Sequence, residues 1–97
     1  MAYEIIFAPQ AIEDLKTLRA VDRSEVRSAI ETHLRHAPCK ASKTRIKRLR
    51  GLRQPEYRLR VDDFRVFYDV VESEVHVLAV IAKHRTDEWL EEHGIVL

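Results

Sequence analysis

The clearest pattern of apolar and polar positions lies in the second half of the chain. Residues 57–61 (YRLRV) alternate between the two classes, and this period of two predicts a half-buried strand. FRVFYDVV at 64–71 and VHVLAVIAK at 75–83 predict two more strands, joined by tight turns. The last run is almost entirely apolar, so we expect it to be a central strand that is covered on both faces.

The first half of the chain has the period of helices. Residues 3–7 (YEIIF) predict a short strand, and Pro9 suits the first turn of a helix over 9–20, in which apolar residues recur at helical spacing. Asp22 followed by Glu25 resembles a capping box that opens a second helix, and the next proline in the chain ends it. Two helices this close in sequence predict a helical hairpin.

Between the two halves lies a segment without clear periodicity. Residues 39–55 predict a basic loop, with a short strand around 46–49, and residues 86–93 predict a terminal helix that ends near Gly94. The predicted order is β-α-α-β-β-β-α. We therefore expect one α+β domain over 1–97, in which the helical hairpin packs on a small antiparallel sheet that the first strand joins.

Composition adds a charge asymmetry to this picture. The 97 residues carry a formal charge of only +1, yet residues 40–65 hold ten Lys or Arg against three acids. Such a basic sector favours an anionic partner. The single cysteine, Cys39, excludes an intramolecular disulfide, and we see neither a signal peptide nor a run long enough to span a bilayer. We expect a cytoplasmic protein without a membrane partner.

Three arginines of the predicted hairpin are candidates for binding phosphate. Arg58 and Arg60 share one face of their strand, roughly 7 Å apart, and Arg65 follows just across the turn. The planar guanidinium fork matches phosphate oxygens, and the basic loop before the strand favours a nucleic-acid surface. The alternative is a solvated face on which these arginines pair with the neighbouring acids Glu56, Asp62 and Asp63.

A second candidate is the run KHRTDEW at 83–89, which follows the central strand and opens the last helix. His84 is the side chain here that titrates near neutral pH, and it is either a proton-transfer group or an ordinary surface histidine. Trp89 either stacks on a nucleic-acid base or anchors the last helix against the sheet. The histidines show no metal-ligand spacing and no glycine-rich phosphate loop is present, so we expect no metal and no cofactor.

KRLRGLRQPEYRLRVDDFRVFYDV and VHVLAVIAKHRTDEW resemble the RelE/ParE family of bacterial toxins from type II toxin–antitoxin pairs, over about residues 3–93. The resemblance implies a microbial-ribonuclease-like RelE fold and, in its RelE-like branch, ribosome-dependent mRNA cleavage by attack of a ribose 2′-OH on the adjacent phosphate. It implies a catalytic set of Arg58, Arg60, Arg65, His84 and Arg85. The RNA-binding set that we expect is Lys43, Arg45, Lys47, Arg48, Arg50, Arg53, Lys83 and Trp89.

Within this resemblance, arginine cannot act as a general base because it stays protonated, so His84 is the candidate acid or base. The chain departs from RelE itself, which has lysines at the positions of Arg58 and Arg60 and a tyrosine implicated in catalysis at that of Trp89. Two alternatives follow: a ParE-type inhibitor of DNA gyrase, or an inactive member that only binds antitoxin or RNA.

The resemblance also implies partners. They are an acidic, RelB-like antitoxin that folds on binding in a hetero-oligomeric complex, the ribosome with its mRNA, and operator DNA contacted through the antitoxin.

Overall fold

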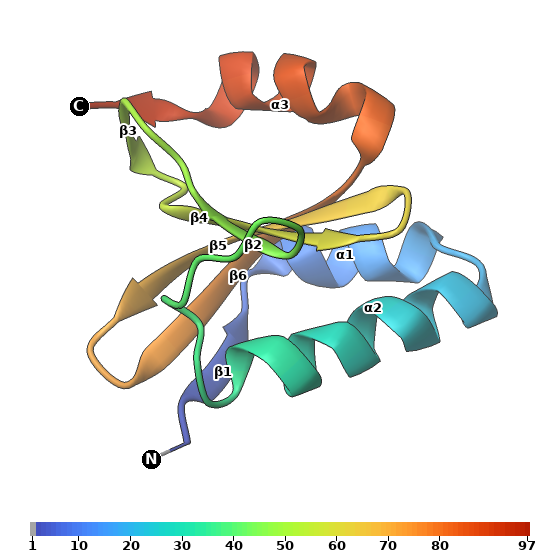
Figure 1. Cartoon of the computed structure of the whole chain (residues 1–97). Coiled ribbons are helices and arrows are strands. Elements are labelled where there is room, and N and C mark those ends of the chain that lie inside the picture. Colours follow the sequence, from blue (N-terminus) through green and yellow to red (C-terminus); the bar gives the residue numbers. More distant parts are fainter. Residues whose placement is uncertain (1) are drawn as a thin grey trace.

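The sheet of this α+β fold separates two helices on one face from a third helix on the other (Figure 1). The structure is a computed structural model that describes residues 2–97. The helices α1 and α2 form the predicted hairpin, and the three predicted strands of the second half are all present. The elements are β1 Glu4–Phe7, α1 Pro9–Thr17, α2 Ala20–Leu34, β2 Ile46–Arg48, β3 Leu52–Gln54, β4 Tyr57–Val61, β5 Phe64–Val71, β6 Glu74–Ala82, the short 3-10 helix η1 Lys83–Arg85, α3 Thr86–His93 and β7 Ile95–Val96.

The main sheet has the strand order β1-β6-β5-β4-β2. Strands β4, β5 and β6 form the predicted antiparallel meander. The predicted central strand, β6, is an inner strand between β1 and β5, and β5 is the middle strand of the sheet. Strand β1 joins the sheet as predicted, but it runs parallel to β6, with Ile5 beside Val75. The sheet is therefore mixed: the predicted antiparallel arrangement holds for every pair of its strands except β1 and β6. A parallel pair needs a long crossover connection, and the helical hairpin forms part of that connection.

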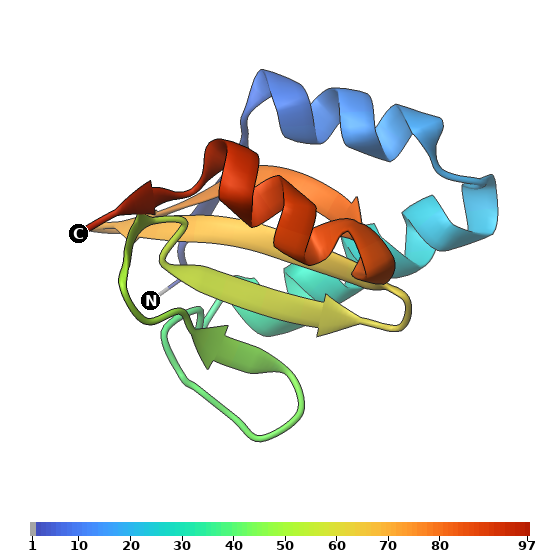
Figure 2. The ribbon, with the colours of Figure 1, turned by 90° about the horizontal axis from the view of Figure 1, so that it is seen from above.

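The alternating strands divide the sheet into an apolar face and a charged face. Leu59 on β4 and Val66 on β5 are opposite each other and fully buried. They contribute to the core together with Leu15, Ile30 and Leu34 from the two helices. The other face of β4 carries its arginines, and α3 lies over this face (Figure 2). The core thus fixes which side chains of the hairpin point toward α3.

The second helix begins differently from the prediction. It starts at Ala20, two residues earlier than the proposed cap, and no side chain caps it. Asp22 lies within the first turn, where a carboxylate is favoured by the helix dipole, and its Oδ2 is 3.3 Å from Nε of Arg19. The prediction of a capping box was therefore wrong, because Asp22, which was expected to precede the helix as its cap, lies inside the first turn.

The basic segment is more ordered than a loop. It contains the predicted short strand as β2, and it also contains β3, which the sequence did not predict. Strand β3 pairs with β7 at the end of the chain, placing Leu52 opposite Val96 in a separate two-stranded sheet. The basic segment is thereby joined to the residues that follow α3. Within residues 2–97, no helix is both long and apolar enough to cross a membrane.

Tyr68 ties the sheet to the segment after α2. Its buried hydroxyl donates a hydrogen bond of 2.6 Å to the carbonyl oxygen of Pro38, and burial raises the pKa of the phenol. Tyr68→Phe leaves this buried carbonyl without its donor, so we expect the free energy of unfolding to fall by about 1–2 kcal/mol. Urea unfolding measures this change. Tyr3→Phe is the control, and equal stability of both variants would contradict the prediction.

Candidate functional site

Strand register places the three hairpin arginines on one face of the sheet. Arg60 on β4 is directly opposite Arg65 on β5, and Arg58 is opposite Phe67. Directly paired residues point to the same face, so the three guanidinium groups share the face that α3 partly covers. We call Arg58, Arg60 and Arg65 the arginine cluster. Lys47 on β2 is opposite Arg58 and extends the positive charge toward the sheet edge.

The three members of the arginine cluster differ in burial. Arg65 is only 7% exposed, and its Nη1 donates hydrogen bonds of 2.9 Å to the carbonyl oxygens of Asp62 and Phe64. Arg60 is exposed. Arg58 is half-buried, and within residues 2–97 its buried Nε has no hydrogen-bond partner. A buried donor without an acceptor is costly, so this Nε lowers the stability of the folded toxin.

The electrostatics of the cluster reflect mutual repulsion. Burial lowers the pKa of Arg58, and the nearby charge of Arg60 lowers it further. Burial likewise lowers the pKa of Arg65, with added repulsion from Arg58 and Arg60 and a smaller opposing effect from Asp63. All three side chains still remain cations at biological pH. The cluster therefore concentrates positive charge that a phosphate group would offset.

The alternative in which neighbouring acids neutralise the cluster does not describe the structure. Within residues 2–97, no member of the arginine cluster forms an ion pair. Glu56 pairs with Arg48 instead, at 3.5 Å. The carboxylate of Asp62 interacts with Glu25 of α2, and this hydrogen bond raises the pKa of Glu25. The acids near the cluster are thus engaged elsewhere or, like Asp63, have no side-chain partner in the part of the chain that is described.

The residues that follow β6 lie at the turn end of the hairpin. The backbone N–H of Lys83 donates a hydrogen bond of 2.7 Å to the carbonyl oxygen of Asp63, which fixes η1 beside the β4–β5 turn. Lys83, His84 and Arg85 are all exposed. The structure therefore brings Lys83, His84 and Arg85 to the end of the sheet where Arg60 and Arg65 lie.

Trp89 has a packing role. Its ring stacks on Phe67 with a centroid distance of 4.8 Å and an interplanar angle of 14°, and it also contacts His93, at 5.3 Å. Phe67 is the residue opposite Arg58, so this stack fixes α3 beside the arginine cluster. These contacts support the interpretation that Trp89 anchors the last helix.

Comparison with known proteins identifies the family. A family model described as the ParE toxin of the type II toxin–antitoxin system parDE matches residues 5–88. The chain belongs to this toxin family. The membership in the RelE/ParE superfamily that the sequence motifs indicated is therefore confirmed. No curated protein shows a significant sequence match to the toxin.

Solved structures share the fold of the toxin. The RelE–RelB complex from Pyrococcus horikoshii OT3 matches with a TM-score of 0.71 and 23% identity, covering 88% of this chain and 99% of that chain. The RelB–RelE antitoxin–toxin complex from Methanococcus jannaschii matches with a TM-score of 0.67 and 21% identity, covering 87% of this chain and 96% of that chain. A RelE mutant from E. coli in the free state matches with a TM-score of 0.69 and 23% identity, covering 95% of this chain and 94% of that chain. The RelE fold predicted for this chain is confirmed.

The basic segment of the toxin presents most of the predicted RNA-binding side chains to solvent. Lys47 and Arg53 are exposed on strands, and the loops around them expose Lys43, Arg45 and Arg50. Arg48 differs from these residues. Its guanidinium lies 5.0 Å from the ring centroid of Tyr57 and pairs with Glu56, so it also has a structural role.

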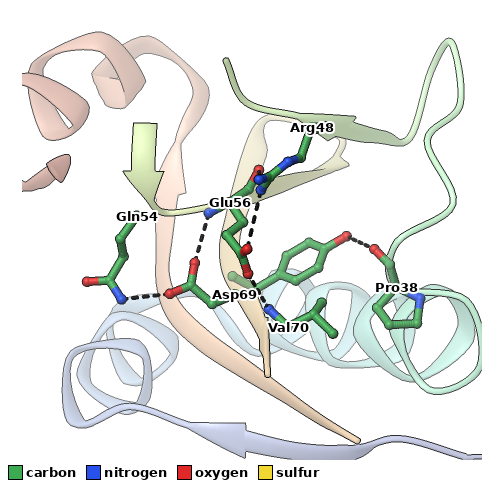
Figure 3. Close-up of polar contacts among 7 residues, drawn as sticks. Pro38, Arg48, Gln54, Glu56, Asp69 and Val70 are labelled. Atoms are coloured by element: carbon green, nitrogen blue, oxygen red, sulfur yellow. Dashed lines mark hydrogen bonds and ion pairs between the residues drawn. The ribbon is translucent and has the colours of Figure 1, made fainter. Parts of the chain in front are cut away.

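A network of carboxylates, which the sequence did not suggest, holds the start of β4 (Figure 3). The buried Asp69 on β5 accepts hydrogen bonds from Gln54 Nε2 at 2.6 Å and from the backbone N–H of Glu56 at 2.8 Å. Glu56 in turn accepts a hydrogen bond of 2.9 Å from the backbone N–H of Val70. We call these contacts of Asp69 and Glu56 the carboxylate clamp. One signal was available in the sequence, namely an acid inside the apolar run FRVFYDVV.

Proposed function

We propose that this toxin is a ribosome-dependent mRNA endoribonuclease of the RelE type. The observation that carries the proposal is the arginine cluster, three guanidinium groups on one sheet face without ion-pair partners in residues 2–97. Its half-buried member Arg58 has an Nε that lacks an acceptor. Such an arrangement suits a phosphate that gains negative charge during the reaction, because fixed donors cost little reorganisation when that charge develops.

The proposed chemistry is attack of a ribose 2′-OH on the adjacent phosphate, with the 5′-oxygen as the leaving group. Arg58, Arg60 and Arg65 hold the phosphate and stabilise the pentavalent phosphorane. His84, exposed at the turn end of the hairpin, takes the proton from the attacking 2′-OH and then delivers a proton to the leaving 5′-oxygen, and Arg85 adds a further cation. The arginines supply positive charge themselves, so this mechanism requires no metal ion.

The proposed partners follow from the same charge. Several matching toxins were solved with an antitoxin, as in the RelE–RelB complexes. We propose that an acidic antitoxin covers the basic surface of this toxin, folds as it binds and contacts operator DNA, while the free toxin acts in the cytoplasm on ribosome-bound mRNA.

A second candidate function is inhibition of DNA gyrase. Two observations favour it: the matching family model is described as a ParE toxin, and the aromatic residue of α3 is a packed tryptophan without an ionisable group. Under this function the basic surface binds a protein or DNA and cleaves nothing.

Primer extension on a reporter mRNA in a reconstituted translation system separates the two functions. We expect the toxin to produce cuts that appear only when ribosomes translate the message and that disappear with Arg85→Ala. Growth arrest in cells without any cut, accompanied by an early stop of replication, would move the assignment to gyrase. If the toxin produces no cuts and no growth arrest, the remaining interpretation is a protein with the toxin fold that only binds its partners.

A further inference from the structure

The exposed carboxylate of Asp62 lies between an acid of α2 and the arginine cluster. The β4–β5 turn and the start of α2 lie at the same end of the molecule (Figure 1, Figure 2), and there the Asp62 side chain shares a hydrogen bond with Glu25. Asp62 also lines a hollow of about 280 Å³ together with Thr44, Arg45 and Arg60. One carboxylate therefore has an acid on one helix and two arginines of the sheet edge as neighbours, and in this structure it is bound to the acid.

The hydrogen bond between Glu25 and Asp62 requires a proton. An ionised carboxylate only accepts hydrogen bonds, so two carboxyl groups bond to each other only when one of them is protonated. This hydrogen bond and the charge of Asp62 raise the pKa of Glu25, with smaller contributions from burial and from Asp22. When both groups are ionised, their like charges repel and the Asp62 carboxylate is no longer held on α2.

The charges around a released Asp62 side chain direct it toward the arginines. Asp22 and Glu25 repel it from α2, whereas Arg60 and Arg45 have no ion-pair partner within residues 2–97. The carbonyl oxygen of Asp62 accepts a hydrogen bond from Arg65, so the backbone of the turn is held and only the carboxylate has to rotate. The charged and titratable groups that line hollows with Glu25 or Asp62 are Arg19, Asp22, His33, Arg45, Arg60, Asp63 and Lys83.

We propose that Asp62 is an internal counter-ion of Arg60 that competes with the phosphate of RNA, and that Glu25 sets the strength of this competition by holding the Asp62 carboxylate on α2. The proposal rests on the proposed function, because it requires the arginine cluster to bind RNA phosphate, and it adds a regulator of that binding. With the shared proton in place, Arg60 is free for RNA. Without that proton, Asp62 turns to Arg60 and offsets part of its charge.

Two variants of Glu25 that carry the same charge separate this role from a general charge effect. Glu25→Gln keeps an amide donor that holds the Asp62 carboxylate on α2 at any pH. Glu25→Ala removes the donor, so Asp62 is free to pair with Arg60. Asp62→Asn removes the proposed counter-ion itself. Asp62 has a positive φ of 48°, a conformation that asparagine adopts readily, so Asp62→Asn is compatible with the turn.

The test measures binding without cleavage. A short oligouridine with 2′-O-methyl groups, which block the attacking hydroxyl, is titrated against the full chain by fluorescence anisotropy at neutral pH and at one fixed salt concentration. An exposed ion pair contributes little free energy, so we expect Glu25→Gln to bind this RNA about threefold more tightly than Glu25→Ala. In the Asp62→Asn background we expect the two Glu25 variants to bind equally, because the competing carboxylate is gone.

The pH dependence of RNA binding has an expected sign. We expect the RNA affinity of the wild-type toxin to fall as the pH rises through the titration of the Glu25–Asp62 pair, because the proton that holds Asp62 on α2 is lost. Deprotonation of His33 and His84 acts in the same direction. The wild-type toxin is therefore compared with Glu25→Gln, which keeps both histidines, and the wild-type toxin should show the steeper fall.

Equal affinity of Glu25→Gln and Glu25→Ala would overturn the proposal, and so would a difference that persists in the Asp62→Asn background. Circular dichroism melting shows whether each variant is folded. Ribosome-dependent cuts without the difference in affinity would leave the proposed function and remove the counter-ion. The difference in affinity without any cut would leave the counter-ion and remove the proposed cleavage, and the absence of RNA binding in every variant would remove both.

Discussion

Replacing Arg58 with methionine is expected to lower mRNA cleavage at least a hundredfold while making the folded toxin more stable by about 1 kcal/mol. The loss of cleavage follows because a positioned donor to the developing charge on phosphate is removed. The gain in stability follows because the buried Nε of Arg58 lacks a partner within residues 2–97 and its charge is repelled by Arg60. Methionine has a side chain of similar length that can lie beside Phe67, and it has no buried N–H group that needs a hydrogen-bond partner.

The opposite signs of these two effects distinguish a functional residue from a structural one. Cleavage is measured by primer extension at equal toxin concentration, and stability by urea unfolding. Arg27→Met is the control, since Arg27 is an exposed arginine of α2 that contacts Phe7 on the other side of the sheet. Loss of both stability and cleavage in Arg58→Met would assign Arg58 a structural role. Greater stability with full cleavage would place the reacting phosphate elsewhere.

The alternation of residues 57–61 explains why the arginine face was predictable. A strand with one buried face has a strongly specified register, because a shift by one residue would bury arginines and expose Leu59. The two-residue turn then brings Arg65 opposite Arg60 with little freedom. Local pattern and tertiary packing agree in this region, so the sequence alone was sufficient to predict which face of the hairpin carries the arginines.

The unpredicted features depend on partners that are distant in sequence. Strand β3 has only three residues, and its pairing with β7 joins Gln54 to Ile95, a contact that no local period reveals. The parallel direction of β1 is likewise set by the crossover connection and not by its own residues. Side-chain partners are similarly hidden, so Arg48 was grouped with the RNA-binding residues although it contacts Tyr57 and Glu56.

The carboxylate clamp is expected to contribute more to the stability of the toxin than the Tyr68 hydroxyl, because Asp69 accepts two hydrogen bonds. Asp69 is 8% exposed and accepts two hydrogen bonds, one from the side chain of Gln54 and one from the backbone of Glu56. These contacts join β5 to the end of β3 and to the residue just before β4. Asp69→Ala leaves both donors without their acceptor, so we expect the free energy of unfolding to fall by about 2–4 kcal/mol.

Urea unfolding of Asp69→Ala, Asp69→Asn and the surface control Glu13→Ala tests this expectation. Asparagine keeps one acceptor for the backbone N–H of Glu56, and the amide of Gln54 can rotate to accept from the new amide group, so Asp69→Asn should lose less than half as much. Because the clamp holds the residue before β4, the alanine variant should also weaken RNA binding through Arg58 in the fraction that stays folded. Similar stability of Asp69→Ala and Glu13→Ala would show that the clamp contributes nothing to the fold, and the position of Arg58 would then depend on strand pairing alone.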